Sequence, residues 1–171
     1  MSRRSRFLLA AVGVFALGAS VSACSDSGTS MHHVVKVDLT SINKVLHKVG
    51  ADDAKVYGFN DLTGAGTDSD GSKVDVEFLA FVDYNKGSGA FDGVLTFTFA
   101  NGDTLGVRIV GGKAVAATDT TDATFASKLD VIDGTAGHQG SSGKGTFVGA
   151  RKDALGGLVQ ATFDMNVVVA G

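Results

Sequence analysis

The sequence predicts an all-β protein: a small antiparallel β-barrel of about eight strands with one short helix, preceded by a signal peptide and a flexible tether. Three observations support this prediction. Apolar and polar residues alternate along most of the chain, which is typical of strands with one buried face. Glycine, aspartate and asparagine interrupt the alternation at short intervals, as turns do. An apolar segment followed by the only cysteine occupies the first 24 residues.

Residues 1–23 have the three parts of a bacterial secretory signal. Three arginines precede an apolar core over residues 7–17, and small residues lead up to Ala23. The core is shorter than the roughly 20 apolar residues of a membrane-spanning helix. Val21-Ser22-Ala23-Cys24 resembles the lipobox of bacterial lipoproteins, in which the cysteine thiol is alkylated by diacylglycerol and becomes the new N-terminus. The resemblance implies an extracytoplasmic protein with a lipid anchor at Cys24, on the cell membrane or the outer membrane; the alternative is a secreted protein with an incidental cysteine.

The predicted mature protein is one acidic domain. Residues 24–30 are polar and small and form the expected tether, and residues 31–171 form the barrel. Removal of residues 1–23 leaves 148 residues with 12 basic and 18 acidic side chains, a net charge of −6. This charge argues against a nucleic acid or an anionic lipid surface as the partner. With Cys24 acylated, the domain has no thiol for a disulfide or a metal, so its stability comes from its core.

The alternation predicts strands in chain order. Residues 95–99 and 105–109 form a hairpin, since Asn101-Gly102 between them is a strong signal for a two-residue turn. The clearest strand is the last, where six apolar residues alternate with polar ones. In order, the predicted strands are 33–39, 54–60, 73–83, 95–99, 105–109, 113–118, 124–132, 145–149 and 159–169.

One segment has a different period. Leu39, Ile42, Val45, Leu46 and Val49 recur at intervals of three and four residues, which indicates a helix. A threonine or serine at its start and a glycine after its end are suitable caps. We therefore expect a short helix over 41–49 that packs against the barrel or plugs it.

An internal repeat favours a barrel over a sandwich. Residues 87–93 and 143–149 both read G-x-G-x-F-x-G, with an aromatic side chain expected to point inward and glycines where small barrels bend. Together with Phe97-Thr98-Phe99-Ala100-Asn101-Gly102-Asp103-Thr104-Leu105 and the run from Ile132 to Gly140, the second copy resembles the bacterial secreted branch of the allene oxide cyclase-like and dirigent-like β-barrels.

The resemblance covers about residues 87–169 and implies an eight-stranded antiparallel barrel with a hydrophobic cavity. Family members commonly have Gly-Gly-Thr-Gly followed by an aromatic residue, whereas this chain has Gly134-Thr135-Ala136-Gly137 and then His138. The shared motif consists of structural glycines and core phenylalanines, so it implies a fold and no catalytic residue.

Alternating strands also occur in outer-membrane barrels, which have strands of about ten residues and aromatic girdles. Here most predicted strands are shorter and the phenylalanines lie in mid-strand. Only Tyr57 and Tyr84 could belong to a girdle, so a barrel with its apolar face inward is the better interpretation.

The candidate ligand contacts lie on the apolar faces of two strands. Phe97, Phe99, Phe163 and Met165 are the residues expected to line a cavity. An eight-stranded barrel is just wide enough either to be filled by side chains or to hold one small ligand, and the sequence leaves both alternatives open.

No metal or cofactor motif is expected. Asp68, Asp70 and Glu77 match positions three, five and twelve of a calcium loop, but Gly66 occupies position one, where the first carboxylate belongs. We therefore predict a solvated Asp-Gly turn, with calcium as the alternative.

The four histidines are weaker candidates. His32 and His33 lie on opposite faces of a strand, so at most one can join a site, and His47 is expected on the polar side of the helix. His138, close to Ser141 and Ser142, is expected in a solvated turn at the barrel rim.

The sequence thus predicts a lipid-anchored, non-catalytic binding or interaction module, with a small apolar ligand as its expected partner and no cofactor. One alternative is an isomerase or cyclase acting on an unsaturated apolar substrate, which would require a polar or ionisable residue on an inward face. The inward sets identified from the alternation are nearly uniformly apolar, which favours binding. Another alternative is a surface protein with a filled barrel and no ligand; the oligomeric state stays open.

Overall fold

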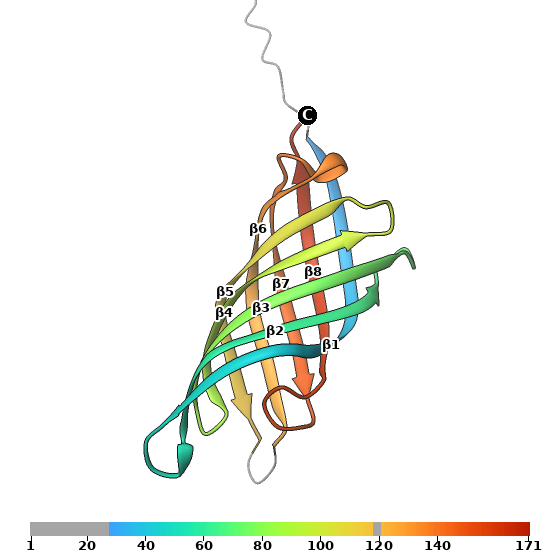
Figure 1. The fold of residues 1–171 in the computed structure, drawn as a ribbon. Coiled ribbons are helices and arrows are strands. Elements are labelled where there is room, and N and C mark those ends of the chain that lie inside the picture. Colours follow the sequence, from blue (N-terminus) through green and yellow to red (C-terminus); the bar gives the residue numbers. More distant parts are fainter. Residues whose placement is uncertain (1–27, 118–120) are drawn as a thin grey trace, which may run out of the picture.

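A computed structural model describes residues 28–117 and 121–171 of the chain. These residues form one closed antiparallel barrel in which each strand pairs with its neighbours in the sequence and β1 pairs with β8 (Figure 1). The strands are β1 (Thr29–Val49), β2 (Lys55–Thr67), β3 (Lys73–Asn85), β4 (Ser88–Phe99), β5 (Thr104–Ala116), β6 (Ala123–Gly134), β7 (Ser142–Arg151) and β8 (Val159–Val169). The predicted barrel of eight strands is confirmed.

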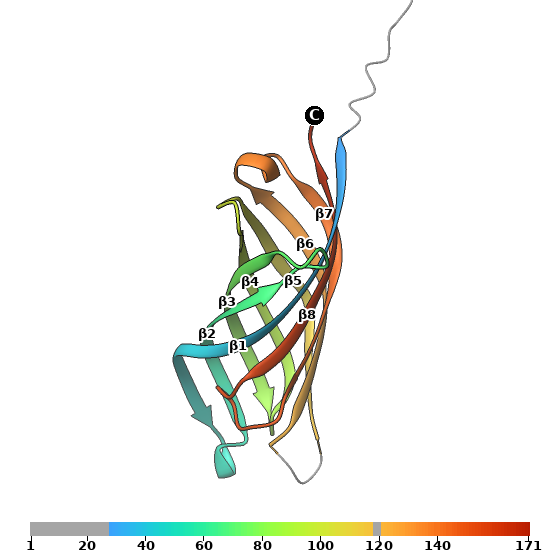
Figure 2. The same cartoon turned by 90° about the vertical axis from the view of Figure 1, so that its right-hand side faces the viewer.

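The two described ends of the chain lie together at one end of the barrel. Thr29 pairs with Val169, and the pairing of β1 with β8 continues to Leu39 opposite Val159. We call this end, which is uppermost in Figures 1 and 2, the upper end. The connections β1–β2, β3–β4, β5–β6 and β7–β8 lie at the opposite, lower end. Because β1 begins at Thr29, the strand starts inside the predicted tether of residues 24–30.

The helix predicted over 41–49 is wrong, because these residues continue β1. Residues 43–49 pair with 55–61 of β2, and the register shifts between Ser41 and Asn43. This bulge inserts one extra residue, Ile42, so the alternation changes phase and imitates a helical period. A nine-residue helix would be marginal by itself, whereas the strand satisfies its backbone on β2. The only helical turns among the described residues are the short 3₁₀ segments η1 (Ala51–Asp53) and η2 (Ala136–His138).

A second bulge joins two predicted strands into one. The segment predicted at 105–109 and residues 113–116 of the segment predicted at 113–118 are both parts of β5, and the register with β6 shifts between Val110 and Lys113. Gly111 has a φ of 64° there, a conformation that glycine adopts without strain. A side chain at Gly112 would collide with the Phe91 carbonyl oxygen, which lies 2.3 Å from the position of a Cβ. The strand prediction was therefore correct in kind but split β5 in two.

Two further predictions are confirmed. The hairpin of β4 and β5 forms, with Thr98 opposite Thr104. Its turn spans residues 100–103, and of the two predicted turn residues only Gly102 has a positive φ, 88°, so the turn is longer than the expected two residues. The phenylalanines of the internal repeat, Phe91 and Phe147, both point into the barrel and contact each other edge to face at 6.0 Å.

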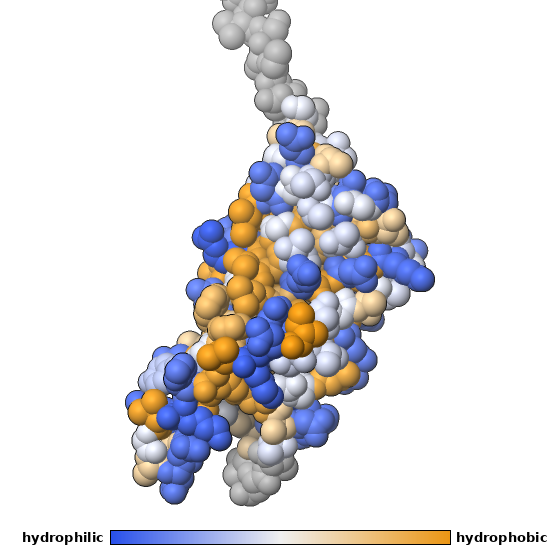
Figure 3. Space-filling view, viewed as in Figure 1, coloured by the Kyte–Doolittle hydropathy of each residue, from blue (hydrophilic) through white to orange (hydrophobic). Residues whose placement is uncertain are grey.

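The strands are 10 to 21 residues long, so the prediction that most are short is wrong. The distribution of side chains still differs from that of an outer-membrane barrel, which is polar inside and has an apolar outer band. Here most side chains that face the lumen are apolar, and every strand carries charged side chains on its outer face. Figure 3 shows charged and apolar side chains mixed on one face of the outer wall. Among residues 28–117 and 121–171, no helix is long and apolar enough to cross a membrane.

Candidate functional site

The middle of the lumen is filled by side chains. Phe97, Phe147, Phe163 and Met165 are fully or almost fully buried. The ring of Phe163 stacks on Phe147 at 4.9 Å and meets Phe97 edge to face at 5.2 Å. Three of the predicted ligand contacts, Phe97, Phe163 and Met165, are therefore packed in the core. The fourth, Phe99, lies closer to the upper end and stacks on His138 at 4.6 Å.

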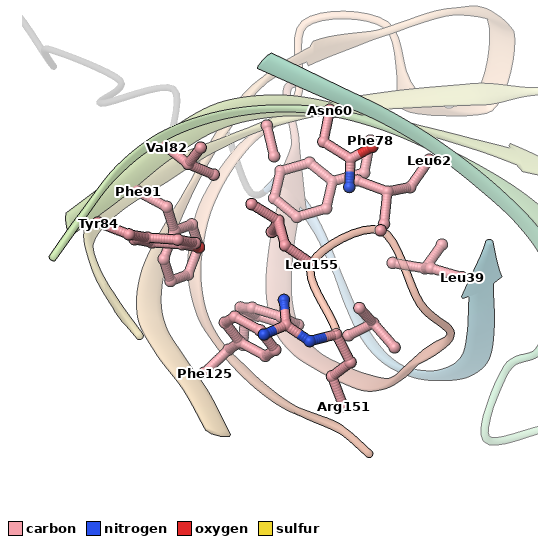
Figure 4. A pocket seen from close by; sticks show the side chains of 14 residues that line it. Leu39, Asn60, Leu62, Phe78, Val82, Tyr84, Phe91, Phe125, Arg151 and Leu155 are labelled. Carbon is pink, nitrogen blue, oxygen red and sulfur yellow. The ribbon is translucent and has the colours of Figure 1, made fainter. Parts of the chain in front are cut away.

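The lumen stays partly open at its lower end. A cavity of about 40 Å³ lies there, which we call the lower pocket (Figure 4). None of the four predicted ligand contacts lines it. Seven strands and the β7–β8 connection contribute its walls: Leu39, Asn60, Leu62, Phe78, Ala80, Val82, Tyr84, Phe91, Phe125, Phe147, Arg151, Leu155, Gly156 and Val159.

The walls of the lower pocket are apolar except for three side chains. Arg151, the last residue of β7, is only 5 % exposed. Its Nε donates a hydrogen bond to the backbone oxygen of Asp153 at 2.6 Å, and its guanidinium lies 5.6 Å from the centre of the Phe125 ring. Burial lowers the pKa of Arg151, although an arginine keeps its charge in a protein.

Tyr84 and Asn60 are the other two polar side chains of the pocket. Burial raises the pKa of Tyr84 to about 12, so its hydroxyl keeps its proton at neutral pH. The Oδ1 of Asn60 accepts a hydrogen bond from the Ser41 hydroxyl, which leaves the amide N–H groups of Asn60 as its remaining polar atoms.

A second polar group lies in the lumen near the upper end. Asp68, in the turn between β2 and β3, reaches across to β1: its Oδ2 lies 2.6 Å from Nδ1 of His33, and its Oδ1 accepts the backbone N–H of Val34 at 2.9 Å. Since an ionised carboxylate only accepts hydrogen bonds, Nδ1 of His33 carries the proton. The Nε2 atoms of His33 and His138 lie 3.5 Å apart. We call Asp68, His33 and His138 the Asp–His–His cluster.

The environment shifts the pKa values of two members of this cluster. Burial by itself raises the pKa of Asp68, but the hydrogen bonds from His33 and Ser69 and the charge of His33 outweigh burial and lower it. The pKa of His138 is lowered by burial, and further by the neighbouring His33, against an opposing effect of Asp103. The Nδ1 of His138 is buried without a hydrogen-bond partner among the described residues.

These shifts predict that acid destabilises the protein in two stages. Below the ordinary histidine pKa of 6.5, the unfolded chain binds a proton that folded His138 resists, so the free energy of unfolding falls as the pH falls from about 7 toward 5. The contribution of Asp68 is complete above its ordinary pKa of 3.8 and is lost as the pH falls from that value through the lower folded pKa. Chemical denaturation measured at half-unit steps of pH checks this order.

Two histidine variants test whether His138 causes the loss of stability between pH 7 and 5. His138→Phe removes the titrating group and keeps a ring against Phe99, so its stability should fall less between pH 7 and 5 than that of the wild type. His47→Phe is the matched control, because His47 is exposed on β1 and its replacement should leave the slope unchanged. Equal slopes for wild type and His138→Phe would contradict the assignment.

The remaining histidine and serine predictions have mixed outcomes. His32 and His33 do lie on opposite faces of β1: His32 is exposed and pairs with Asp164 on β8 at 2.8 Å, while His33 faces the lumen. His47 lies on a strand, since the helix expected there does not form. The prediction that His138 is solvated is wrong, because it is only 6 % exposed.

The two serines near His138 do not form a catalytic pair with a lumenal histidine. No serine hydroxyl hydrogen-bonds either lumenal histidine among the described residues, so Ser141 and Ser142 form no nucleophile–base pair there.

The predicted Asp-Gly turn is confirmed, but it is not solvated throughout. Gly71 N–H donates to the Asp68 carbonyl at 2.9 Å, and β3 follows at Lys73. The three carboxylates of the calcium alternative do not converge on one point. Asp68 contacts His33, and exposed Asp70 accepts the backbone N–H of Ser72. Glu77 lies on the outer face of β3. No group of three or more His, Cys, Asp or Glu residues in the described ranges has a metal-binding arrangement. Cys24 lies outside the described residues.

Sequence reasoning missed Arg151, although a signal for it was present. Phe147, Gly149 and Arg151 occupy alternate positions of β7, so an inward Phe147 places Arg151 inward too. The expectation of nearly uniformly apolar inward faces is therefore wrong, since Arg151, Tyr84, Asn60 and His33 all face the lumen. The contact of Asp68 with His33 had no comparable signal, because it depends on the registers of β1, β2 and β3 together.

Comparison with known proteins does not assign the chain to a family. No protein-family model, curated protein or solved structure matches it. The resemblance to allene oxide cyclase-like and dirigent-like barrels stays a prediction based on the motifs described above.

Proposed function

We propose that this protein is a lipid-anchored, extracytoplasmic binding module that holds a small, mainly apolar ligand in the lower pocket. One observation carries the proposal: the lumen is filled by side chains along its middle but opens at one end into an apolar pocket with a few polar groups. Binding sites for small molecules commonly combine an apolar lining with a few placed polar side chains. The anchor rests on the resemblance of residues 21–24 to a lipobox.

The volume of the pocket limits what it can hold. Drug-sized ligands occupy sites of roughly 300–1,000 Å³, whereas the lower pocket has about 40 Å³. A ligand therefore buries only a short apolar group in this conformation, with the remainder at the mouth. Ionisable side chains in the lumen favour the isomerase or cyclase alternative: those of the Asp–His–His cluster and, in the pocket itself, that of Arg151. The cluster lies near the upper end, away from the pocket, and Arg151 keeps its proton and cannot act as a base, so we favour binding.

Native mass spectrometry of the full protein, extracted from its own membrane, tests the proposal. We expect an intact mass that includes a lipid on Cys24, and an additional small molecule that is released on collisional activation. Ala80→Val should abolish the second mass increment, since Ala80 lines the pocket and the added methyl groups fill its free space.

Ala126→Val provides the control for this experiment. Ala126 is exposed on the outer face of β6, so the same chemical change there should leave the bound molecule in place. A barrel that is consistently ligand-free in wild type would support the alternative of a filled barrel and overturn the binding proposal. A missing lipid on Cys24 would overturn the anchor alone.

A further inference from the structure

The polar groups of the lower pocket that make no hydrogen bond to another described residue can all donate one. They are N–H groups and one protonated hydroxyl. Arg151 uses Nε for the Asp153 carbonyl, and its two terminal nitrogens make no hydrogen bond among the described residues. Asn60 has its oxygen occupied by Ser41 and its amide N–H groups left over. Tyr84 keeps its phenolic proton, because burial raises its pKa to about 12. Figure 4 shows the guanidinium of Arg151 and the hydroxyl end of Tyr84 directed into the space between the walls.

The charge of Arg151 has no carboxylate partner inside the pocket. None of the 14 residues that line the pocket is acidic. No acidic side chain lies within ion-pair distance of Arg151 in the described part of the chain. Asp153, whose charge acts on Arg151 from a distance, is exposed on the β7–β8 connection. Buried charges in proteins are normally paired, so a 5 % exposed guanidinium without a carboxylate beside an apolar cavity points to an anion as its missing partner.

We propose that the ligand of the lower pocket is a monocarboxylate with a short apolar chain, and that Arg151 binds its carboxylate. The planar guanidinium matches a carboxylate with two parallel hydrogen bonds. The Tyr84 hydroxyl and the Asn60 amide supply further donors from β3 and β2. The apolar walls, among them Phe78, Leu62 and Val159, then surround the chain. This inference rests on the proposed function, because it specifies the chemistry of the ligand of that same pocket.

Binding of matched acids and alcohols to the membrane-extracted protein tests the inference. Isothermal titration calorimetry with butyrate, hexanoate, 1-butanol and 1-hexanol compares ligands that differ only in the carboxylate at each chain length. We expect the carboxylate to bind about tenfold or more tightly than the alcohol of the same length, since hydrogen bonds to charged groups are among the stronger ones.

Two arginine variants assign this preference to one side chain. Arg151→Met keeps the length of the side chain and removes its charge, so it should lose the preference for the carboxylate while binding of the alcohol changes less than twofold. Arg108→Met is the matched control: Arg108 is exposed on the outer face of β5, and its replacement should leave both affinities unchanged. Thermal unfolding of each variant shows whether it has folded.

Each result separates the inference from the proposed function. Equal affinity of wild type for acids and alcohols would overturn the anion site and leave the apolar pocket standing. Carboxylate binding that survives in folded Arg151→Met would also overturn it, because the anion would then bind elsewhere. Absence of binding by every acid and alcohol would overturn both proposals. If Arg151→Met does not fold, Arg151→Lys replaces it, and retention of the full preference in that variant would contradict a two-bond guanidinium contact.

Discussion

Replacement of Phe163 by alanine is expected to lower the free energy of unfolding by about 3–5 kcal/mol. Phe163 is completely buried at the centre of the lumen, between Phe147 at 4.9 Å and Phe97 at 5.2 Å. Removing its ring takes away buried apolar surface and leaves a cavity that the closed wall of eight strands cannot collapse to fill. Equilibrium unfolding in urea or guanidinium chloride measures the change.

Phe81 offers a control for the loss of a phenyl ring. It lies on the outer face of β3 and is 51 % exposed, so Phe81→Ala should have a much smaller effect than Phe163→Ala. A cost below about 1 kcal/mol for Phe163→Ala would mean that the middle of the lumen tolerates an empty space. The description of a filled barrel with one open end would then have to be abandoned.

Replacement of Asp68 by alanine is expected to cost about 3 kcal/mol, the second largest effect among these predictions. The carboxylate accepts hydrogen bonds from Nδ1 of His33 at 2.6 Å, from the Val34 N–H at 2.9 Å and from the Ser69 N–H at 2.6 Å. Alanine leaves these three donors without their acceptor. Two of the donors, on His33 and Val34, belong to β1 at the upper end of the lumen. Chemical denaturation at pH 7, where the carboxylate is ionised, gives the value.

Asp70 is the matched control in the same turn. Its carboxylate accepts the backbone N–H of Ser72 at 2.8 Å, and its side chain is exposed to solvent. Asp70→Ala should therefore have a much smaller effect than Asp68→Ala. If the two variants are equally stable, the turn tolerates loss of the Asp68 contacts and the Asp–His–His cluster does not hold β1 to the β2–β3 connection.

The alternation of apolar and polar residues predicted most of the fold, because each strand of a barrel has one buried face. Alternation identified the strands and their inward residues, and Asn101-Gly102 identified the turn between β4 and β5. The errors lie at bulges. Ile42 shifted the phase of β1 and produced the false helix, and Gly111-Gly112 divided β5, since one inserted residue reverses the faces of all that follow.

The candidate site was less predictable than the fold. An inward position for Arg151 follows from the alternation of β7, but its burial depends on the β7–β8 connection and Phe125, which come from other parts of the chain. The space at the lower end is the difference between the volume of the lumen and the volumes of side chains from seven strands. No local sequence pattern predicts this difference in volume, so the alternation of residues could not show whether the barrel is filled or hollow.

The pairing of Thr29 with Val169 gives the molecule a direction relative to a membrane. Four residues lie between Cys24 and Thr29, so the five steps from one Cα atom to the next span at most about 18 Å. With Cys24 anchored as proposed, the upper end of the barrel faces the lipid, and the 11 residues of β8 run about 35 Å along the strand toward the lower end. The mouth of the lower pocket then opens toward the surrounding water. A ligand would therefore be captured from solution and not drawn sideways out of the bilayer, which agrees with a short, water-soluble acid.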